Sequence, residues 1–337
     1  MKEGKDSLMS KKLLTISVAA YNVEKYLENT LQHLVIPECL DKLEVFVIDD
    51  GGKDNSLRIA QEYEKKYPDT FRAVHKENGG YGSTVAYSID HAQGEFFKLL
   101  DGDDWFDGKG LVKVLEVLEN CSEDVVITDY FIGPDENNLS IISCNHNDGD
   151  IECVKSYETA IPHGMWALFY RTAVLREARI QFPLHTLYTD QLYATMPFAF
   201  AKNIRFCQTP VYCYRFGRDE QSTSRISRIK HIEDMLKVCS ILYDFYDLHK
   251  EEKNAYLLCR TARYYLGAIR TMLLLPVNSA NKKKIAEYEK TNQRDHSDIF
   301  FAAEKGTLIA KYIKMLRRTH YMLYWTVKLI PEKYVNF

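Results

Sequence analysis

Short apolar runs alternate with amphipathic segments along the first 130 residues. The runs at 13–22 (LLTISVAAYN), 43–50 (LEVFVIDD) and 95–100 (EFFKLL) are rich in β-branched, leucine or aromatic side chains, and similar runs occupy 71–77 and 124–131. This composition is typical of buried strands. The sequence therefore predicts five strands in this part of the chain.

The segments between these runs place apolar residues three and four positions apart. They predict helices over 23–36, 57–67, 82–93 and 110–120. Strands that alternate with helices of this length usually form a mainly parallel sheet with helices on both faces. We therefore predict an α/β fold, in which ligands bind at the carboxyl ends of the strands.

The pattern changes after the first two thirds of the chain. Residues 203–225 predict a strand pair, or one strand followed by a loop, and 229–249 and 254–275 then predict amphipathic helices. The expected division is a polar tail over 1–12, an α/β domain over 13–220 and a helical region over 221–337.

Composition and charge narrow the class of protein. The chain has 337 residues, 46% of them hydrophobic, and a net charge of −3, which gives no reason to expect a nucleic-acid partner. Its eight cysteines form no C-x-x-C pair and predict reduced thiols in a cytoplasmic protein. The polar N-terminus lacks the apolar segment of a secretory signal, and no apolar run approaches the ~20 residues of a membrane span.

The last segment, 305–337, departs from this charge balance. It has seven lysines and arginines against one glutamate, mixed with tyrosine, tryptophan, leucine and isoleucine. Basic and aromatic residues on a helix too polar to span a bilayer are typical of membrane-surface binding. Packing onto the rest of the protein or onto another subunit is the alternative. The first interpretation predicts a cytoplasmic protein held at the inner face of the cell membrane.

Polar clusters follow three of the predicted strands: Tyr21 with Asn22, Asp49 with Asp50, and Asp101, Asp103 and Asp104. Asparagine and aspartate after a strand commonly cap the next helix. One cap needs one carboxylate, however, and three neighbouring carboxylates repel one another. A divalent cation, which takes hard oxygen ligands, would compensate them. We therefore favour a site for metal-assisted phosphate binding over a capping turn.

Four stretches resemble the family 2 glycosyltransferases in their order and separation. They are ISVAAYNVEKYLENTLQHL, EVFVIDDGGKDNS, ENGGYGSTVAYSIDHAQGEFFKLLDGDDW and ALFYRTAVLREARIQFP with the later YTDQLY, and the resemblance covers about residues 13–220. It implies a GT-A fold, a nucleotide-diphosphate sugar donor, most simply a UDP-sugar, a Mn²⁺ or Mg²⁺ ion, and inversion at the anomeric carbon. The implied acceptor is a hydroxyl of a polysaccharide, a lipid-linked glycan or a cell-wall or capsule polymer.

The resemblance also implies roles for the donor-side residues, which it places in 13–130. Ala19, Tyr21 and Asn22 would lie beside the donor base, and Asp50 would accept from its imide nitrogen and ribose region. Asp101 and Asp103 match the paired aspartates of the family, with Asp103 as the direct metal ligand. Asp104 would support them.

Residues 131–220 are the implied acceptor side. Composition alone favours a helix cap for Asp190, but the order of the motifs favours the other interpretation. In LYTDQLY, Asp190 matches the aspartate that serves the family as catalytic base. Trp166, Tyr188 and Gln191 would line the acceptor pocket. The loop 217–224 would close over the donor, with an ordinary surface loop as the alternative.

Several positions depart from the family pattern. Gly51-Gly52 stand where Gly-Ser is usual, Thr189 stands where an acidic residue is usual, and Val85-Ala86 replace a frequent Arg-Asn. A basic contact to the diphosphate would then come from another side chain, and the candidates are Lys76, Arg215, Arg218 and Arg225.

Two other functions stay open. A sugar nucleotidyltransferase also needs a nucleotide-binding α/β domain and acidic metal ligands, but it would want a glycine-rich basic loop where this chain has AAYNVEKY. A non-catalytic nucleotide-sugar-binding subunit would keep Asp50 and Asp103 and tolerate the loss of Asp190.

Overall fold

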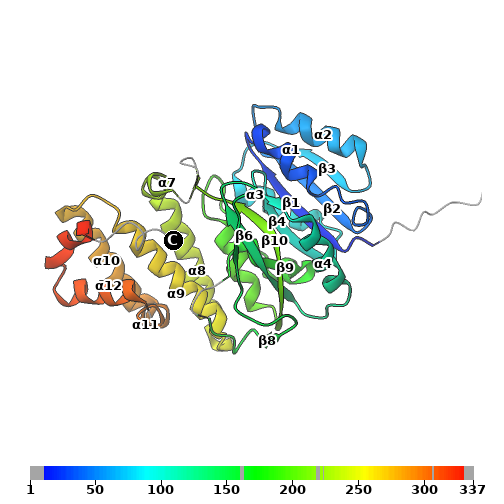
Figure 1. Ribbon diagram of the computed structural model, residues 1–337. Coiled ribbons are helices and arrows are strands. Elements are labelled where there is room, and N and C mark those ends of the chain that lie inside the picture. Colours follow the sequence, from blue (N-terminus) through cyan, green and yellow to red (C-terminus); the bar gives the residue numbers. More distant parts are fainter. Residues whose placement is uncertain (1–10, 160–162, 218–220, 223, 306, 330–337) are drawn as a thin grey trace, which may run out of the picture. The chain divides into compact units, whose positions relative to one another are not determined.

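A computed structural model describes residues 11–159, 163–217, 221–222, 224–305 and 307–329. The chain forms two compact units (Figure 1). The first unit comprises Met1–Ile151, Met165–His185 and Asn203–Phe216, and the second comprises Glu152–Gly164, Thr186–Lys202 and Gly217–Phe337.

The first unit is built around one mixed sheet. Its strands are β1 (Leu14–Ala20), β2 (Leu43–Asp49), β3 (Phe71–His75), β4 (Phe96–Asp101), β5 (Trp105–Phe106), β6 (Val125–Gly133), β7 (Ser140–Ile142), β9 (Leu168–Arg171) and β10 (Asn203–Arg215). The main path of the sheet is β3-β2-β1-β4-β9-β6-β10-β5, and β7 pairs with β6. A further strand, β8 (Ile151–Cys153), begins at the boundary between the units.

Strand direction changes at β9. The strands from β3 to β4 run parallel to one another, whereas β9 is antiparallel to both of its neighbours, β4 and β6. Residues of β1, β2 and β4 are almost entirely buried, which explains their continuous apolar sequences. Together they form the core of this unit.

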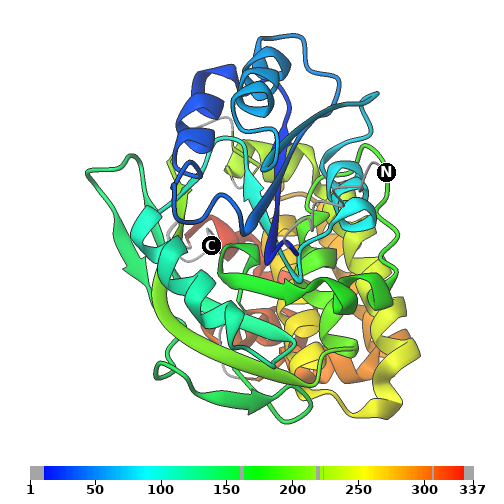
Figure 2. The ribbon, with the colours of Figure 1, turned by 90° about the vertical axis from the view of Figure 1, so that its right-hand side faces the viewer.

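Helices cover both faces of the parallel strands. Figure 2 shows α1 and α2 on one side of β1 and α3 on the other. The helices of the first unit are α1 (Glu24–Gln32), α2 (Ser56–Lys66), α3 (Tyr81–His91), α4 (Gly108–Glu119), η1 (Met165–Ala167) and α5 (Thr172–Ala178). Asp107 caps α4 by accepting a hydrogen bond from the Gly110 N–H at 2.7 Å.

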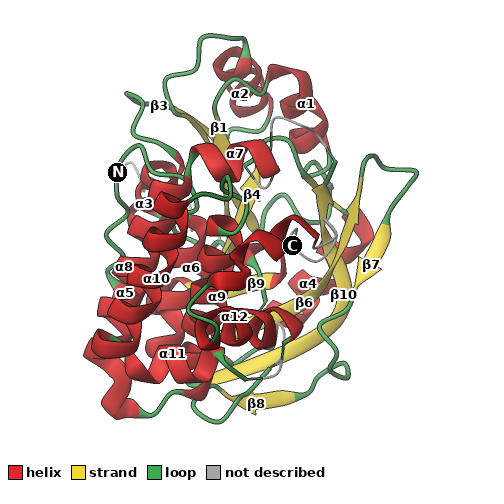
Figure 3. Cartoon of the chain, turned by 90° about the vertical axis from the view of Figure 1, so that its left-hand side faces the viewer, coloured by secondary structure: helices red, strands yellow, loops and turns green. Residues whose placement is uncertain are grey.

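The described part of the second unit is mainly helical (Figure 3). Its helices are α6 (Asp190–Thr195), η2 (Met196–Ala199), α7 (Arg225–Lys230), α8 (Ile232–His249), η3 (Lys250–Glu252), α9 (Ala255–Met272), α10 (Ser279–Asp295), α11 (Ser297–Ala303), α12 (Leu308–Arg318) and η4 (Met322–Leu329). Helix α9 packs against α8 and α11, and its buried aliphatic and tyrosine side chains form the centre of this unit's core.

The α/β fold is confirmed, and each strand and helix expected between residues 13 and 131 exists within a few residues of its predicted bounds. The sheet is mainly parallel, as expected from the sequence, and the short strands β5, β7 and β9 pair antiparallel within it. Helix α6 ends at Thr195, and the chain continues as a 3₁₀ turn that contains Pro197.

Other expectations have mixed outcomes. Residues 203–215 form one long strand whose register shifts between Cys207 and Tyr212, so a strand followed by a loop is the right alternative. The domain boundaries expected from the sequence stay a prediction. Residues 1–10 of the expected tail lie outside the described residues. Among the described helices, none is both long and apolar enough to cross a bilayer.

Candidate active site

Strand β4 ends in an acidic turn that the fold holds tightly against β1. Asp101 pairs in register with Ala19, and the Gly102 N–H donates to the Ala19 carbonyl at 3.1 Å. A Cβ atom at Gly102 would lie 2.6 Å from that carbonyl oxygen, so only glycine fits there. From the other side, the Thr30 hydroxyl bonds the Gly102 and Asp104 carbonyls at 3.0 and 2.7 Å. The turn is therefore fixed before any ligand arrives.

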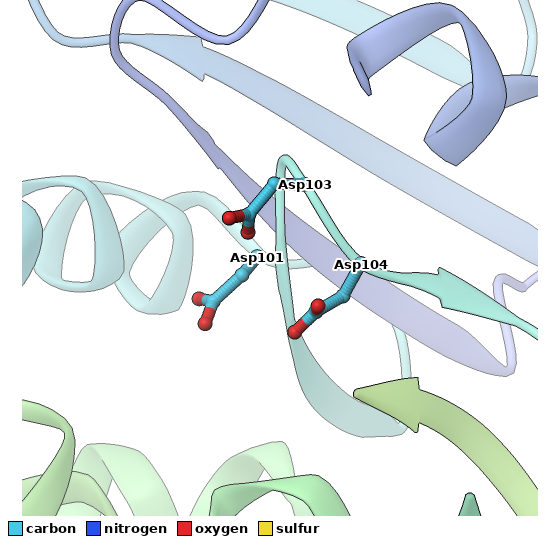
Figure 4. Close-up of side chains that lie close together, drawn as sticks. All are labelled: Asp101, Asp103 and Asp104. Atoms are coloured by element: carbon cyan, nitrogen blue, oxygen red, sulfur yellow. The ribbon is translucent and has the colours of Figure 1, made fainter. Parts of the chain in front are cut away.

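The three carboxyl groups of this turn lie close together (Figure 4). Asp101, Asp103 and Asp104 each have a carboxylate oxygen within 4.8 Å of the others. Asp101 and Asp103 project to the same side of the turn in Figure 4, and both are partly accessible. Hard oxygen ligands at this spacing suit Mg²⁺ or Mn²⁺.

Asp104 differs from its neighbours because protein groups hold both of its oxygens. Tyr212 donates to Oδ2 at 2.6 Å and the Arg215 N–H donates to Oδ1 at 2.8 Å. Its side chain is 1% exposed. Burial, together with the charge of Asp101, holds the pKa of Asp104 well above its usual range. Asp104 thus ties the acidic turn to β10.

Arg215 reinforces the same connection. Its Nε donates to the Asp103 carbonyl at 2.9 Å, and its guanidinium lies over the Trp105 ring at 4.7 Å from the centroid. The sequence suggests Arg215 as a diphosphate contact, but these contacts place it as a brace for the turn. Of the other basic candidates, Lys76 is committed to Asp50, Arg225 is exposed on α7 of the second unit, and Arg218 lies outside the described residues.

Asp50 follows β2 at the same edge of the sheet. It is 3% exposed, and its Oδ1 accepts from Lys76 Nζ at 2.5 Å and from the Gly79 N–H at 3.0 Å. Its Oδ2 accepts from the Gly80 N–H at 2.8 Å. Asp50 therefore organises the Gly79-Gly80 turn before α3. Ser83 Oγ also lies 3.3 Å from Oδ1, so the acceptor position left for a further donor is on Oδ2.

The residues expected beside the donor base lie at the end of β1. Asn22 adopts a left-handed backbone (φ +54°), and its Oδ1 accepts from the Lys53 N–H at 2.8 Å. Tyr21 is 52% exposed and Ala19 is partly exposed. Because Ala19 pairs with Asp101 and Ala20 with Asp49, these positions stand between the two acidic strand ends.

Lys98 is a feature of this unit that the sequence reasoning missed. This fully buried residue of β4 donates from Nζ to the carbonyls of Met165 and Trp166 at 2.8 and 2.6 Å. Burial holds its pKa well below the usual range. Lys98 thereby fixes η1 beside the strand that carries Asp101. A lysine inside the apolar run EFFKLL was the available signal.

Trp166, expected in the acceptor pocket, belongs to an aromatic group of the first unit. Its ring stacks on Tyr214 at 4.6 Å between centroids and lies 5.6 Å from Tyr130. Its main-chain bond to Lys98 fixes its position. Trp166, Tyr214 and Tyr130 therefore form a partly buried aromatic surface on the sheet of the first unit.

Asp190 belongs to the second unit, where it begins α6. Gln191 Nε2 donates to Asp190 Oδ2 at 2.7 Å, and the Arg260 guanidinium contacts Gln191 Oε1 at 3.4 Å. The residue stays partly accessible, while packing around the carboxyl group raises the pKa of Asp190 despite the opposing effects of Gln191 and Arg260. Arg260, which the sequence reasoning did not single out, supports this residue from α9.

The loop before Asp190 has unusual backbone conformations. His185 and Tyr188 both have positive φ, at +49° and +64°, which is uncommon for residues other than glycine. Tyr188 donates its hydroxyl hydrogen to the Ser222 carbonyl at 3.1 Å. Such strain persists where the surrounding structure requires it, and it commonly occurs at functional sites. The first unit thus gathers the donor-side candidates, and the second holds Tyr188, Asp190 and Gln191.

Comparisons with known proteins bear on this arrangement. Residues 15–176 match the model of the family described as glycosyl transferase family 2. EpsH of Bacillus subtilis (strain 168) is 30% identical over 210 residues, which are 60% of this chain and 60% of EpsH, so the match spans less than two thirds of that relative. The uncharacterized glycosyltransferase MG060 homolog of Mycoplasma pneumoniae is 28% identical over 239 residues, 68% of this chain and 77% of its own length.

A shorter match and two crystal structures complete the comparison. The minor teichoic acid biosynthesis protein GgaB of Bacillus subtilis (strain 168) is 26% identical over 114 residues, 34% of this chain and 13% of GgaB. The crystal structure of S. aureus TarS 1–349 shares 18% identity at a TM-score of 0.58 and covers 90% of this chain and 91% of that one. Its complex with UDP-GlcNAc gives 20% identity, a TM-score of 0.53, and coverage of 87% and 90%. Residues 15–176 therefore form a family 2 glycosyltransferase domain, and the chain has the GT-A fold.

Proposed function

We propose that the protein transfers a sugar, with inversion, from a UDP-linked donor to an acceptor hydroxyl, and that it depends on Mn²⁺ or Mg²⁺. The observation that carries this proposal is the acidic turn at the carboxyl end of β4, beside the end of β1. In an open α/β sheet this is where a nucleotide ligand binds. The UDP-GlcNAc complex of TarS, which shares the fold, supports a UDP-sugar as the donor.

The residues of the turn fit a divalent ion. Asp101 and Asp103, two partly accessible residues on one side of the turn, would hold the ion, whereas Asp104 is committed to Tyr212 and Arg215. When bound, the ion would neutralise the negative charge that develops on the departing nucleoside diphosphate. Thr30, Gly102 and Arg215 would keep the two carboxylates in place and so reduce the cost of ordering them.

The ends of β1 and β2 would bind the nucleoside. Ala19, Tyr21 and Asn22 would contact the base, with the exposed Tyr21 ring available for stacking. Asp50 would accept from the imide nitrogen with its remaining capacity, held in orientation by Lys76, Gly79 and Gly80. These assignments rest on the family resemblance and on the place of the residues at the strand ends.

Asp190 would act as the general base. Its carboxylate would take the proton of the acceptor hydroxyl as the new bond forms between that oxygen and the anomeric carbon, while the bond to UDP breaks and UDP leaves with the electron pair. The raised pKa of Asp190 suits this role, because a base works best when its pKa approaches the working pH. Gln191 would orient the carboxylate, and Tyr188 and Trp166 would offer apolar surface to the acceptor.

The acceptor that we favour is a hydroxyl-rich polymer or lipid-linked glycan of the cell envelope. The partial match to GgaB, whose name refers to teichoic acid biosynthesis, supports this class.

An assay of product release tests the proposal. The protein is incubated with a panel of nucleotide sugars, with Mn²⁺, Mg²⁺ or a chelator, and with or without candidate acceptors. Acceptor-stimulated release of UDP that stops on chelation supports it. Release of pyrophosphate would instead indicate a sugar nucleotidyltransferase, and tight donor binding without any turnover would indicate a non-catalytic binding subunit.

A further inference from the structure

The described end of the chain consists of α12 followed by η4, which belong to the second unit and which we call the C-terminal hairpin. The chain reverses at His320 and Tyr321, which both have positive φ. The Tyr312 hydroxyl and the Thr326 hydroxyl lie 2.8 Å apart and join the two helices. Tyr324 and Val327 of η4 are buried. One face of the hairpin therefore belongs to the core of the unit, and the other faces outward.

The outward face combines bare apolar side chains with positive charge. On η4, Met322, Trp325 and Leu329 are 69%, 56% and 69% exposed, and Leu308 of α12 is 73% exposed. Met322 and Trp325 share one ridge of η4, since residues three apart are aligned in a 3₁₀ helix. Lys311 and Arg318 are exposed on α12. At 100° per residue they fall on the same face as Leu308. We call these six residues the C-terminal patch.

Charges near the patch fall into two groups. Lys314 and Arg317 pair with Glu304 at 3.0 and 2.5 Å. Lys311 and Arg318 are exposed and have no ion pair within the described part of the chain. Lys311 and Arg318 are therefore available to an external partner, whereas Glu304 neutralises the other two cations.

We propose that the C-terminal patch binds the surface of an anionic lipid bilayer. Exposed leucine, methionine and tryptophan would enter the boundary between headgroups and acyl chains, where tryptophan is preferred, and Lys311 and Arg318 would contact anionic headgroups. The inference does not depend on the proposed function, although an enzyme with a lipid-linked acceptor would benefit from it.

A second copy of the chain fits the patch less well. A two-fold contact would place the patch against itself and bring lysine and arginine opposite like charges. Stable dimers also bury about 800 Å² on each partner, whereas the apolar part of this patch consists of four separate side chains. A bilayer needs neither self-complementarity nor a deep groove.

Co-sedimentation with vesicles tests the proposal. The full-length protein should bind vesicles in which about a third of the lipid is phosphatidylglycerol and should be released from them by high salt, with much weaker binding to pure phosphatidylcholine. The double variant Lys311→Ala/Arg318→Ala should bind about tenfold to thirtyfold more weakly, as expected when two surface cations are lost. The double variant Met322→Ser/Trp325→Ser should lose binding even at low salt.

Matched variants and a spectroscopic measurement complete the test. Lys290→Ala and Leu248→Ser change exposed residues of the same unit outside the patch, and they should bind as wild type does. Of the three tryptophans, Trp105 is 2% exposed and Trp166 is partly buried, so a blue shift of emission on vesicle addition should come from Trp325 and vanish in Trp325→Phe. The proposal would be overturned if the wild-type protein did not bind vesicles, or if both double variants bound them as well as wild type does. It would also be overturned if the protein formed a concentration-dependent dimer that these variants abolish.

Discussion

Neighbouring aspartates in the acidic turn differ in what they contact, and this difference predicts opposite phenotypes. Asp104→Ala leaves the buried Tyr212 hydroxyl and the Arg215 N–H without their acceptor. It should lower the free energy of unfolding by about 2–4 kcal/mol. Asp103→Ala removes a partly accessible carboxylate and should change stability by less than about 1 kcal/mol, while abolishing metal-dependent UDP binding.

Urea denaturation and calorimetric titration of UDP in the presence of Mn²⁺ separate these two effects. A stable Asp104→Ala variant would show that the link to β10 is dispensable. If Asp103→Ala bound UDP with wild-type affinity, Asp103 would not be the metal ligand that we propose.

A second residue-scale prediction concerns Asp190. Asp190→Asn should reduce kcat by about 10² to 10⁴, the usual contribution of general-base catalysis, and leave binding of the donor nearly unchanged. Because packing raises the pKa of Asp190 above its ordinary 3.8, the acid side of the wild-type pH–rate profile should fall at a pH above that value. Steady-state and binding measurements across pH check both statements.

The matched control for Asp190 is Asp244→Asn, which changes an exposed carboxylate of α8. It should keep both kcat and the pH profile. If Asp190→Asn retained kcat, or if it lost donor binding in the same proportion, the carboxylate would not be the base.

At this scale the sequence identifies which side chains matter better than it identifies their contacts. The acidic turn was predictable because three adjacent carboxylates after a buried strand are unusual. The burial of Asp104 was not, because its partners Tyr212 and Arg215 lie more than 100 residues away in sequence. The contacts of Arg215 with the acidic turn were not predictable for the same reason. Lys98 was overlooked because its acceptors are main-chain carbonyls, which leave no mark in the side-chain pattern.

Among the elements, α10 and α12 are joined by a buried ion pair with a predictable pH response. Glu289 of α10 is 2% exposed, and its Oε1 lies 3.0 Å from the guanidinium Nη2 of Arg317 on α12. Burial raises the pKa of Glu289 from 4.5 to about 7, although Arg317 opposes the shift. The folded protein therefore holds this proton more tightly than the unfolded chain does. Consequently, stability should fall as the pH rises from about 4.5 to about 7.

This effect should be measurable in denaturant unfolding. The contribution lost across that range is on the order of 3 kcal/mol, and Glu289→Gln should flatten the corresponding part of the stability curve. Glu287→Gln, which changes an exposed carboxylate on the same helix, should leave the slope as it is. If Glu289→Gln kept the wild-type dependence of the free energy of unfolding on pH, another titratable group would cause the loss of stability.

Strands and helices that follow from the residue pattern of their own segment were predicted well. Strands whose direction or register depends on residues far away in sequence were not. Strands β1 to β4 and their helices follow from continuous apolar runs and helical spacing. The four-residue β9 pairs antiparallel between β4 and β6, so its direction depends on neighbours far away in sequence. Strand β10 was ambiguous because its register shifts near Pro210, a residue that cannot donate to the ladder.

For the whole molecule, the family match of residues 15–176 and the fold support the proposed nucleotide-sugar enzyme, and ligand linkage offers a test that needs no acceptor. If Asp101 and Asp103 hold an ion shared with the diphosphate, UDP and Mn²⁺ should stabilise the protein together far more than either does alone. At a ligand concentration of about 100 times Kd the gain is roughly 2.7 kcal/mol, or about 4–6 °C in the Tm of a chain of this size. Differential scanning fluorimetry with a chelator control measures it.

The variants turn this measurement into a decision between two ways of binding a diphosphate. Asp103→Ala should lose the cooperative part of the shift, because the ion then lacks its main protein ligand. Asp190→Asn should keep the shift, since Asp190 belongs to the second unit and its proposed role concerns the acceptor. A full shift with UDP and chelator together would show that side chains alone hold the diphosphate. In that case the closeness of the three carboxylates would need another explanation, because neighbouring carboxylates repel one another when no cation lies between them.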